Sequence, residues 1–148
     1  MQRQRGLTLL ELLVVLAIMG FAISGVSLSL RDSSQTQLER EAQRLVAVLE
    51  AARAQSRTSG IALIWQATPE GFVIRPAQPS PIATRTETWL SAGTQATVAT
   101  PTNSVVLGPE PILAPARITL RVATTDNAKP TPALSIGTDG LQPFQVVP

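Results

Sequence analysis

The start of the chain is one continuous apolar run. Residues from Leu12 to Ile23 are apolar apart from one glycine, and a weaker apolar tail continues to Leu30. As an α-helix with a rise of ~1.5 Å per residue, the roughly 24 residues from Leu7 to Leu30 would cover about 36 Å, more than the ~30 Å hydrocarbon core of a bilayer. The pattern predicts a transmembrane helix over residues 7–30.

A second helical pattern with a narrower apolar stripe follows, over residues 31–59. The stripe recurs at spacings of three and four: Leu38, Ala42, Leu45, Leu49, Ala52 and Ser56. Charged residues occupy the other faces, where Glu41 with Arg44 and Glu50 with Arg53 are either weak i,i+3 pairs, worth ~0.2–0.5 kcal/mol each, or simply a solvated surface. Gly60 is expected to end this amphipathic helix.

The junction of the two helical patterns is polar. Residues 31–34 are either a break or the exit from the membrane, and Ser34 with Gln37 fits a capping box, which is typical of a new helix start. No proline interrupts residues 7–59, so the two patterns could also form one long helix.

Beyond Gly60 the pattern becomes short and alternating, which predicts a β-rich head over residues 60–148. Ile61 to Gln66 and Phe72 to Arg75 flank a Pro-Glu-Gly turn and predict a hairpin. Residues 76–81 are rich in proline and predict a loop, and 126–130 predict a turn. The remaining predicted strands are 84–90, 95–100, 104–107, 117–124, 134–136 and 144–147. The fold class is therefore α+β, with a long N-terminal helix packed on an antiparallel sheet.

Composition argues against catalysis. The chain contains no Cys and no His, so neither thiolate chemistry nor the commonest general base is available, and no enzyme activity or cofactor is expected. Calcium around Asp126, Asn127 or Asp139 is conceivable, but turn chemistry explains these residues without a metal. The net charge is only +2, so nucleic-acid binding is not implied.

The sole charge in the apolar run is Glu11, which would cost roughly 2.5–3.5 kcal/mol at membrane depth. Arg3 and Arg5 precede the run and should remain cytoplasmic, which directs the rest of the chain across the membrane. A cut between Gly6 and Leu7 would free an amine one helical turn from Glu11, or beside the Glu11 of a neighbouring copy. That amine could compensate the buried carboxylate.

The stretch from Gly6 through Glu11 into the apolar run resembles the class III signal of type IV pilins and type II secretion pseudopilins. The resemblance implies that residues 1–6 are a leader removed by prepilin peptidase, that Leu7 is the N-methylated mature terminus in place of the usual phenylalanine, and that Glu11 serves assembly. An ordinary signal peptide or a plain signal anchor are the alternatives.

The amphipathic helix, the hairpin with Phe72 and the closing stretch 137–144 resemble the GspH/FimT group of minor pilins. This resemblance implies a minor pseudopilin of the type II secretion system, of the H type, near the tip of a periplasmic pseudopilus. The partners it implies are other minor pseudopilins, the major pseudopilin, prepilin peptidase, the inner-membrane assembly platform and membrane lipid. It also implies that the chain crosses the inner membrane once and that its head is periplasmic. A minor pilin of a type IV pilus, with a role in pilus assembly or DNA uptake, and an anchored periplasmic binding module are the alternatives. The basic residues that DNA would need are scattered: Arg75, Arg85, Arg117, Arg121 and Lys129.

Overall fold

The structure is a computed structural model that describes the backbone of residues 9–123 and 132–147, and the side chains of all of these except 22–34. The described chain divides into two units, one ending at Ser34 and one beginning at Gln35. Leu7 and Gly6, and the predicted turn at 126–130, lie outside the described residues.

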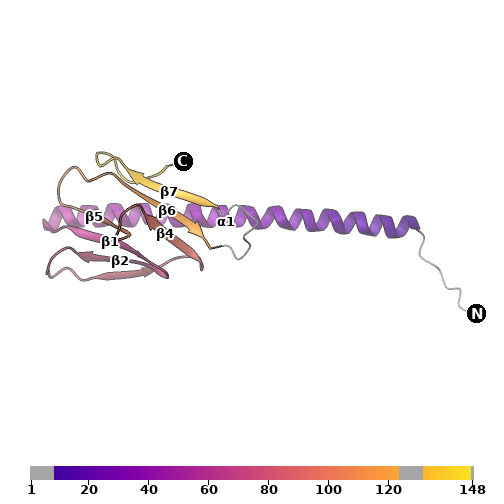
Figure 1. Ribbon diagram of the computed structural model, residues 1–148, viewed down its shortest axis with the longest axis horizontal. Helices are drawn as coiled ribbons and strands as arrows, with labels where there is room; N and C mark the ends of the chain where they lie inside the picture. The colour runs from indigo at the N-terminus through magenta and orange to yellow at the C-terminus, as the bar shows by residue number, and fades with distance from the viewer. Residues whose placement is uncertain (1–8, 124–131, 148) are drawn as a thin grey trace, which may run out of the picture. The chain divides into compact units, whose positions relative to one another are not determined.

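One helix, α1 (Leu9–Ser59), accounts for both helical patterns (Figure 1). The backbone is helical through residues 31–34, so the new helix start expected from the capping box is wrong. Propensity explains this, because the run contains no proline or glycine to interrupt the intrahelical hydrogen bonds. At the other end Gly60 adopts a φ of 71° and its N–H donates to the Ser56 carbonyl at 2.9 Å, so the predicted stop is confirmed.

The head contains two four-stranded antiparallel sheets, which we call sheet A and sheet B. Sheet A has the order β3-β2-β1-β5. Its strands are β1 (Leu63–Thr68), β2 (Gly71–Pro76), β3 (Arg85–Thr88) and β5 (Ser104–Leu107). Sheet B has the order β4-β6-β7-β8. Its strands are β4 (Thr94–Val98), β6 (Ala116–Val122), β7 (Ala133–Thr138) and β8 (Gln145–Val147).

The predicted hairpin is confirmed, with Thr68 opposite Gly71 and the two residues Pro69 and Glu70 between them. A side chain at Gly71 would collide with the backbone of Glu87 on β3, so the closeness of β2 and β3 requires glycine here. The other strand predictions are confirmed with shifts of at most two residues at their ends, as short strands allow. The α+β class is therefore confirmed, although the head has two sheets rather than one.

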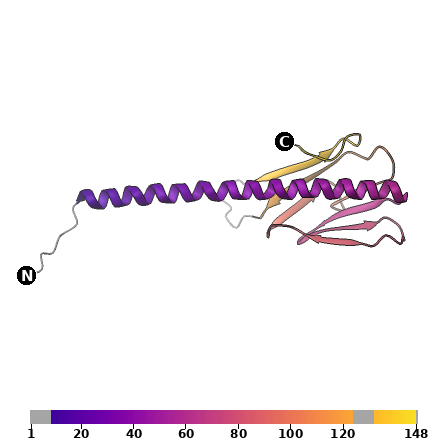
Figure 2. The same ribbon diagram turned by 180° about the vertical axis from the view of Figure 1, so that it is seen from behind.

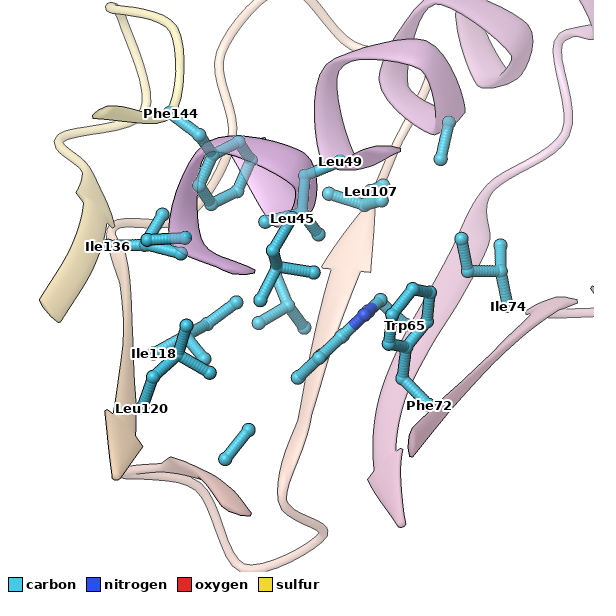
Figure 3. Packing of buried hydrophobic residues seen from close by; sticks show 14 of the residues in the cluster. Leu45, Leu49, Trp65, Phe72, Ile74, Leu107, Ile118, Leu120, Ile136 and Phe144 are labelled. Atoms are coloured by element: carbon cyan, nitrogen blue, oxygen red, sulfur yellow. The ribbon is translucent and has the colours of Figure 1, made fainter. Parts of the chain in front are cut away.

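The second half of α1 lies along the strands of both sheets (Figure 2), and its apolar stripe fills the space between them (Figure 3). All six residues of the predicted stripe are buried, and Leu49 and Ala42 are 0% exposed. In Figure 3, Leu45 and Leu49 lie between the side chains of sheet B, such as Ile118, and those of sheet A, such as Trp65. Burial of each leucine contributes roughly 1.5–3 kcal/mol, so the stripe attaches the helix to both sheets.

Candidate functional site

Residues 9–21 present an apolar surface on every side of the helix. Ten large apolar side chains between Leu9 and Phe21 are exposed: Leu9, Leu10, Leu12, Leu13, Val14, Val15, Leu16, Ile18, Met19 and Phe21. We call residues 9–21 the apolar sleeve. A helix that is apolar all round is suited to a nonpolar environment or to packing among other helices, and not to water.

The predicted processing and assembly residues belong to this end of the chain. Glu11 lies in the first turn of α1, within the apolar sleeve, and its side chain is exposed. Gly6 and Leu7 lie outside the described residues. Within the part of the chain that is described, no helical segment combines the length and hydropathy needed to span a membrane. The transmembrane helix over residues 7–30 stays a prediction.

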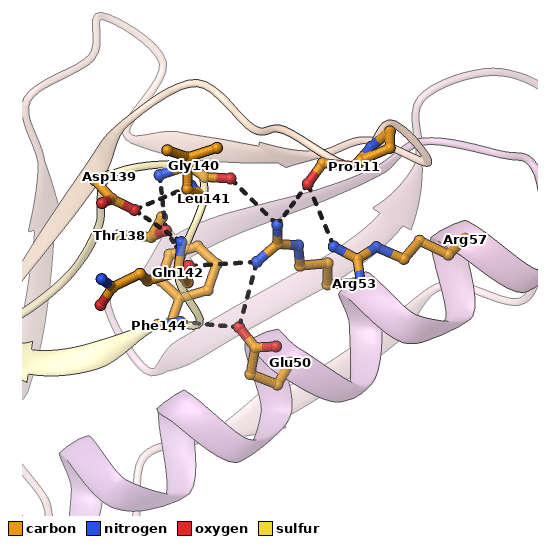
Figure 4. A network of polar contacts seen from close by, with 10 residues as sticks. All are labelled: Glu50, Arg53, Arg57, Pro111, Thr138, Asp139, Gly140, Leu141, Gln142 and Phe144. Carbon is orange, nitrogen blue, oxygen red and sulfur yellow. Dashed lines mark hydrogen bonds and ion pairs between the residues drawn. The ribbon is translucent and has the colours of Figure 1, made fainter.

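A second polar site joins the helix to the loop after β7 (Figure 4). Arg53 is the central residue and is only 3% exposed. Its Nη2 donates to the carbonyl of Pro111 at 3.0 Å and to that of Gly140 at 3.3 Å, and its Nη1 reaches the carbonyl of Gln142 at 3.5 Å. One guanidinium therefore connects α1 to two loops that are distant in sequence.

Glu50, one turn earlier on α1, contacts the same loop. Its Oε1 accepts a hydrogen bond from the Phe144 N–H at 2.9 Å and lies 3.9 Å from Arg53 Nη1. The Glu50 carboxylate thus accepts from the backbone N–H of the residue just before β8 and faces the buried guanidinium of Arg53. Arg57 adds a longer bond of 3.4 Å to the Pro111 carbonyl.

The loop itself, residues 138–144, is fixed by its own side chains. Thr138 Oγ1 accepts from the Gly140 N–H at 2.9 Å and donates to the Gln142 carbonyl at 2.6 Å. Asp139 Oδ1 accepts from the N–H groups of Leu141 and Gln142 at 2.9 and 2.8 Å. These bonds, that of Gln142 first, lower the pKa of the Asp139 carboxyl from its ordinary value of 3.8 because they favour the ionised form. Asp139 therefore serves turn chemistry.

Gly140 explains the close approach of the two loops. Its φ of 93° lies in the left-handed region, and a Cβ there would collide with the Leu113 carbonyl. The Leu113 N–H in turn donates to the Gly140 carbonyl at 3.1 Å. The closing stretch singled out by resemblance is thus the part of the head that Arg53 and Glu50 hold.

A third polar site connects α1 to the end of β3. Glu41 is 1% exposed, and its Oε2 accepts from the Leu90 N–H at 2.7 Å. Arg44 lies 3.4 Å from Glu41 and binds Glu87 at 2.7 Å and the Thr88 carbonyl at 2.9 Å. The interpretation of the charged helix residues as a solvated face is wrong for Glu41 and Arg53, because both are buried and hydrogen-bonded to segments distant in sequence.

The described residues assemble no group that could hold a metal ion. No set of three or more acidic side chains that could hold a metal occurs among them, and Asp126 and Asn127 lie outside. An open groove of ≈ 500 Å³ runs over sheet B beside Arg117, Gly137 and Gln145. Its lining carries one arginine, Arg117, and one acidic residue, Asp139, beside uncharged hydrogen-bonding groups.

Two comparisons with known proteins found a match, one for the first residues of the chain and one for its fold. Residues 1–27 match the family described as the prokaryotic N-terminal methylation motif. The fold is similar to the crystal structure of the type IV minor pilin FimU from Pseudomonas aeruginosa, with a TM-score of 0.53 over 82% of this chain and 92% of that one. The chain is type IV pilin-like. The sequence identity to FimU is 15%, so this likeness concerns the fold. No curated protein matches the chain.

The polar sites around Glu11, Arg53 and Glu41 fall into two classes. The helix-to-loop contacts of Arg53 and Glu41 attach the long helix to its head. Their only signal in the sequence is the presence of charges on a helix next to an apolar stripe. Glu11 and the apolar sleeve belong to the methylation motif that residues 1–27 match. Pilin-type proteins are structural subunits that associate with other pilins and are processed by prepilin peptidase.

Proposed function

We propose that this pilin-like chain is a minor pseudopilin of the type II protein secretion system, of the H type. It would join the tip of the periplasmic pseudopilus and serve the export of folded proteins across the outer membrane, with other minor pseudopilins and the major pseudopilin as partners. The observation that carries the proposal is the combination of a methylation motif over residues 1–27 with an apolar sleeve on a helix whose other half is buried in the head.

The proposed processing follows the motif. Prepilin peptidase would remove residues 1–6 after Gly6, and Leu7 would become the N-methylated terminus. Residues 7–30 would cross the inner membrane once, residues 31–59 would form the amphipathic half of the helix, and residues 60–148 would be the periplasmic head. Arg3 and Arg5 would stay on the cytoplasmic side until cleavage.

Glu11 is the proposed assembly residue. A carboxylate among apolar helices is costly unless a positive group meets it, and the amine of Leu7 in the same subunit or in the subunit it joins would supply that group. When a subunit enters the filament in the correct register, this amine neutralises the charge of Glu11. This makes filament entry dependent on Glu11 while leaving cleavage independent of it.

The test uses the full chain in cells that contain prepilin peptidase and the assembly platform. Intact-mass analysis should find a mature chain that begins at Leu7 and carries one added methyl group. Glu11→Ala should be cleaved as the native chain is but should be reduced at least tenfold in sheared or purified filaments. Glu39→Ala, which removes an exposed acid further along the helix, is the matched control and should enter normally.

Two results would contradict the proposal. A chain that keeps its first residues, or is cut beyond the apolar run, would show that it is not processed as a pilin. Normal filament entry of Glu11→Ala would refute the neutralisation mechanism without touching the family assignment.

A minor pilin of a type IV pilus is the second candidate, and the likeness to FimU, itself a type IV minor pilin, favours it. A role in DNA uptake finds less support. Arg75 lies on sheet A, Arg85 binds Glu87 at 2.6 Å, and Arg117 and Arg121 lie on sheet B, so these cations form no single cluster. Crosslinking in cells followed by mass spectrometry separates the candidates: secretion subunits, pilus subunits, or neither, as for an anchored binding module.

A further inference from the structure

The open groove of sheet B lies on the face of that sheet that points away from the core. Arg117, Gly137 and Gln145 form one cross-strand row along it. Their neighbours in sequence, Ile118 and Ile136, are buried in the core, so the row belongs to the opposite face. The volume of ≈ 500 Å³ falls within the ~300–1,000 Å³ of small-molecule sites. The groove therefore has the size of such a site, and its charges decide which ligand it fits.

The positive charge in the groove is Arg117 on β6. Its side chain is exposed, and it forms no ion pair and no hydrogen bond with a described residue. Arg85, an arginine of sheet A, is by contrast paired with Glu87 at 2.6 Å. The N–H donors of the Arg117 guanidinium are thus available to a ligand.

The negative charge in the groove is Asp139, just past the end of β7. Gly137 is opposite Arg117 in the register, so Asp139, two residues further along, is a diagonal neighbour of Arg117. In a regular antiparallel ladder such neighbours are roughly 7–8 Å apart. The two side chains form no ion pair with each other. One groove is therefore lined by two opposite charges that do not neutralise one another directly.

Backbone contacts hold the Asp139 carboxylate in its own turn. Its Oδ1 accepts from the N–H groups of Leu141 and Gln142 at 2.9 and 2.8 Å, whereas its Oδ2 accepts no hydrogen bond from a described residue (Figure 4). The same bonds lower the pKa of the carboxyl and keep it ionised. One oxygen is thus fixed by the protein, and the other is available to a ligand.

A ligand that carries both signs of charge fits this pair. A purely anionic ligand would be attracted by Arg117 but repelled by Asp139, and for a purely cationic ligand the two effects are reversed. A molecule with one carboxylate and one ammonium group can form a charge-assisted hydrogen bond of ~2.7–2.9 Å to each side chain. The charge pattern therefore selects a zwitterion.

The rest of the lining suits a peptide group. Gly137 has no side chain, so the floor between Arg117 and Gln145 is backbone. Gln142 and Gln145 also line the groove, and each side-chain amide offers both donors and an acceptor. Val147 adds an apolar surface beside them. A short peptide would thus find partners for its backbone between the two charges.

We propose that this groove binds a small zwitterion, either an amino acid or a short peptide with free ends. Arg117 binds the carboxylate of the ligand, and Asp139 Oδ2 binds its ammonium group. The amides of Gln142 and Gln145 meet the peptide group where the ligand has one. The proposal does not depend on which filament the chain joins.

The probe is the dipeptide alanylalanine with free ends, added to the isotope-labelled full chain in a nonionic detergent. NMR detects weak binding, and the amide signals of the groove, that of Gly137 first, should shift saturably. An N-acetylated dipeptide lacks the ammonium group and a C-amidated one lacks the carboxylate. Each should bind about fivefold more weakly, which corresponds to the loss of one exposed charged contact.

Free alanine separates the two sizes of ligand. Affinity equal to that of the dipeptide assigns the groove to a single amino acid, and saturable but weaker binding assigns it to a peptide. Either result supports the proposal, because both ligands carry the two charges.

Two variants connect each end of the ligand to its residue. Asp139→Asn keeps an oxygen that can accept the two turn bonds but removes the charge, so it should weaken the free dipeptide about fivefold without weakening the N-acetylated one. Arg117→Gln should weaken the free dipeptide to a similar degree without weakening the C-amidated one. The matched control is Arg121→Gln, which changes another exposed arginine of β6 outside the groove and should leave every affinity unchanged.

Three results would overturn the proposal. The first is the absence of saturable shifts with both the dipeptide and free alanine. The second is equal binding of the free and the end-blocked dipeptides, because the charges would then make no difference. The third is an equal loss for Arg121→Gln and Arg117→Gln, because the general positive charge of β6 would then explain the binding. The signals of the core show in each case that the variant is folded.

Discussion

Replacing Arg53 with methionine tests whether the buried guanidinium attaches the helix to the head. Methionine retains most of the side chain's length and removes the five donors. The carbonyls of Pro111, Gly140 and Gln142 would each lose a charged donor, of which one bond at 3.0 Å is well formed and two, at 3.3 and 3.5 Å, are longer. Hydrogen bonds to charged groups are worth roughly 1.5–3 kcal/mol.

The net effect is smaller than the sum of these bonds. Removing Arg53 also removes the cost of burying a cation, and Glu50, whose side chain is 35% exposed, can regain water. We therefore expect the free energy of unfolding of the head to fall by about 3 kcal/mol, dominated by the loss of charged hydrogen bonds to three carbonyls, each of which keeps one other donor. Arg53→Lys keeps the charge but cannot bridge both loops, so about half that loss is expected.

The assay is denaturant unfolding of the full chain in detergent, followed by tryptophan fluorescence, since Trp65 is buried in the head and Trp89 nearly so. Arg57→Met is the matched control, because Arg57 is exposed and its one hydrogen bond to a described residue, the Pro111 carbonyl, is 3.4 Å long. It should cost less than about 0.5 kcal/mol. Equal losses for Arg53→Met and Arg57→Met would refute the reasoning, because burial would then make no difference.

Three other changes test the remaining contacts. Glu41→Ala leaves the N–H of Leu90 without its acceptor and should destabilise the head by about 2 kcal/mol in the same unfolding assay; a change below about 0.5 kcal/mol would mean that water replaces the carboxylate. Gly60→Ala forces a β-carbon into a φ of 71° and should cost about 1 kcal/mol, seen as a lower unfolding midpoint at unchanged slope. The lowered pKa of Asp139 means that its stabilising effect is complete above 3.8 and is lost as the pH falls through the lower folded-state pKa. The stability difference between the native chain and Asp139→Ala should accordingly be constant at neutral pH and shrink in acid, and a difference that is flat with pH would exclude this assignment.

The local sequence pattern was sufficient to predict the helix and the strands of the head. The stripe from Leu38 to Ser56 predicts which face of the helix is buried, because a 3.6-residue period has only one way to place those side chains together. The hairpin at Thr68 to Gly71 follows from turn chemistry in the same way. The capping box at Ser34 failed because a local start signal cannot end a helix that no residue interrupts.

The sequence by itself determined the long helix, its apolar sleeve, its buried stripe, the β-rich head and the motif around Glu11, since each depends on neighbours within a few residues. Only the tertiary structure decided that the strands divide into two sheets, that Glu41 and Arg53 are buried, and that Gly140 and Gln142 meet the helix. Those facts depend on partners more than 40 residues apart, such as Arg53 and Gln142, and no periodicity within a segment records which distant carbonyl will meet a given guanidinium.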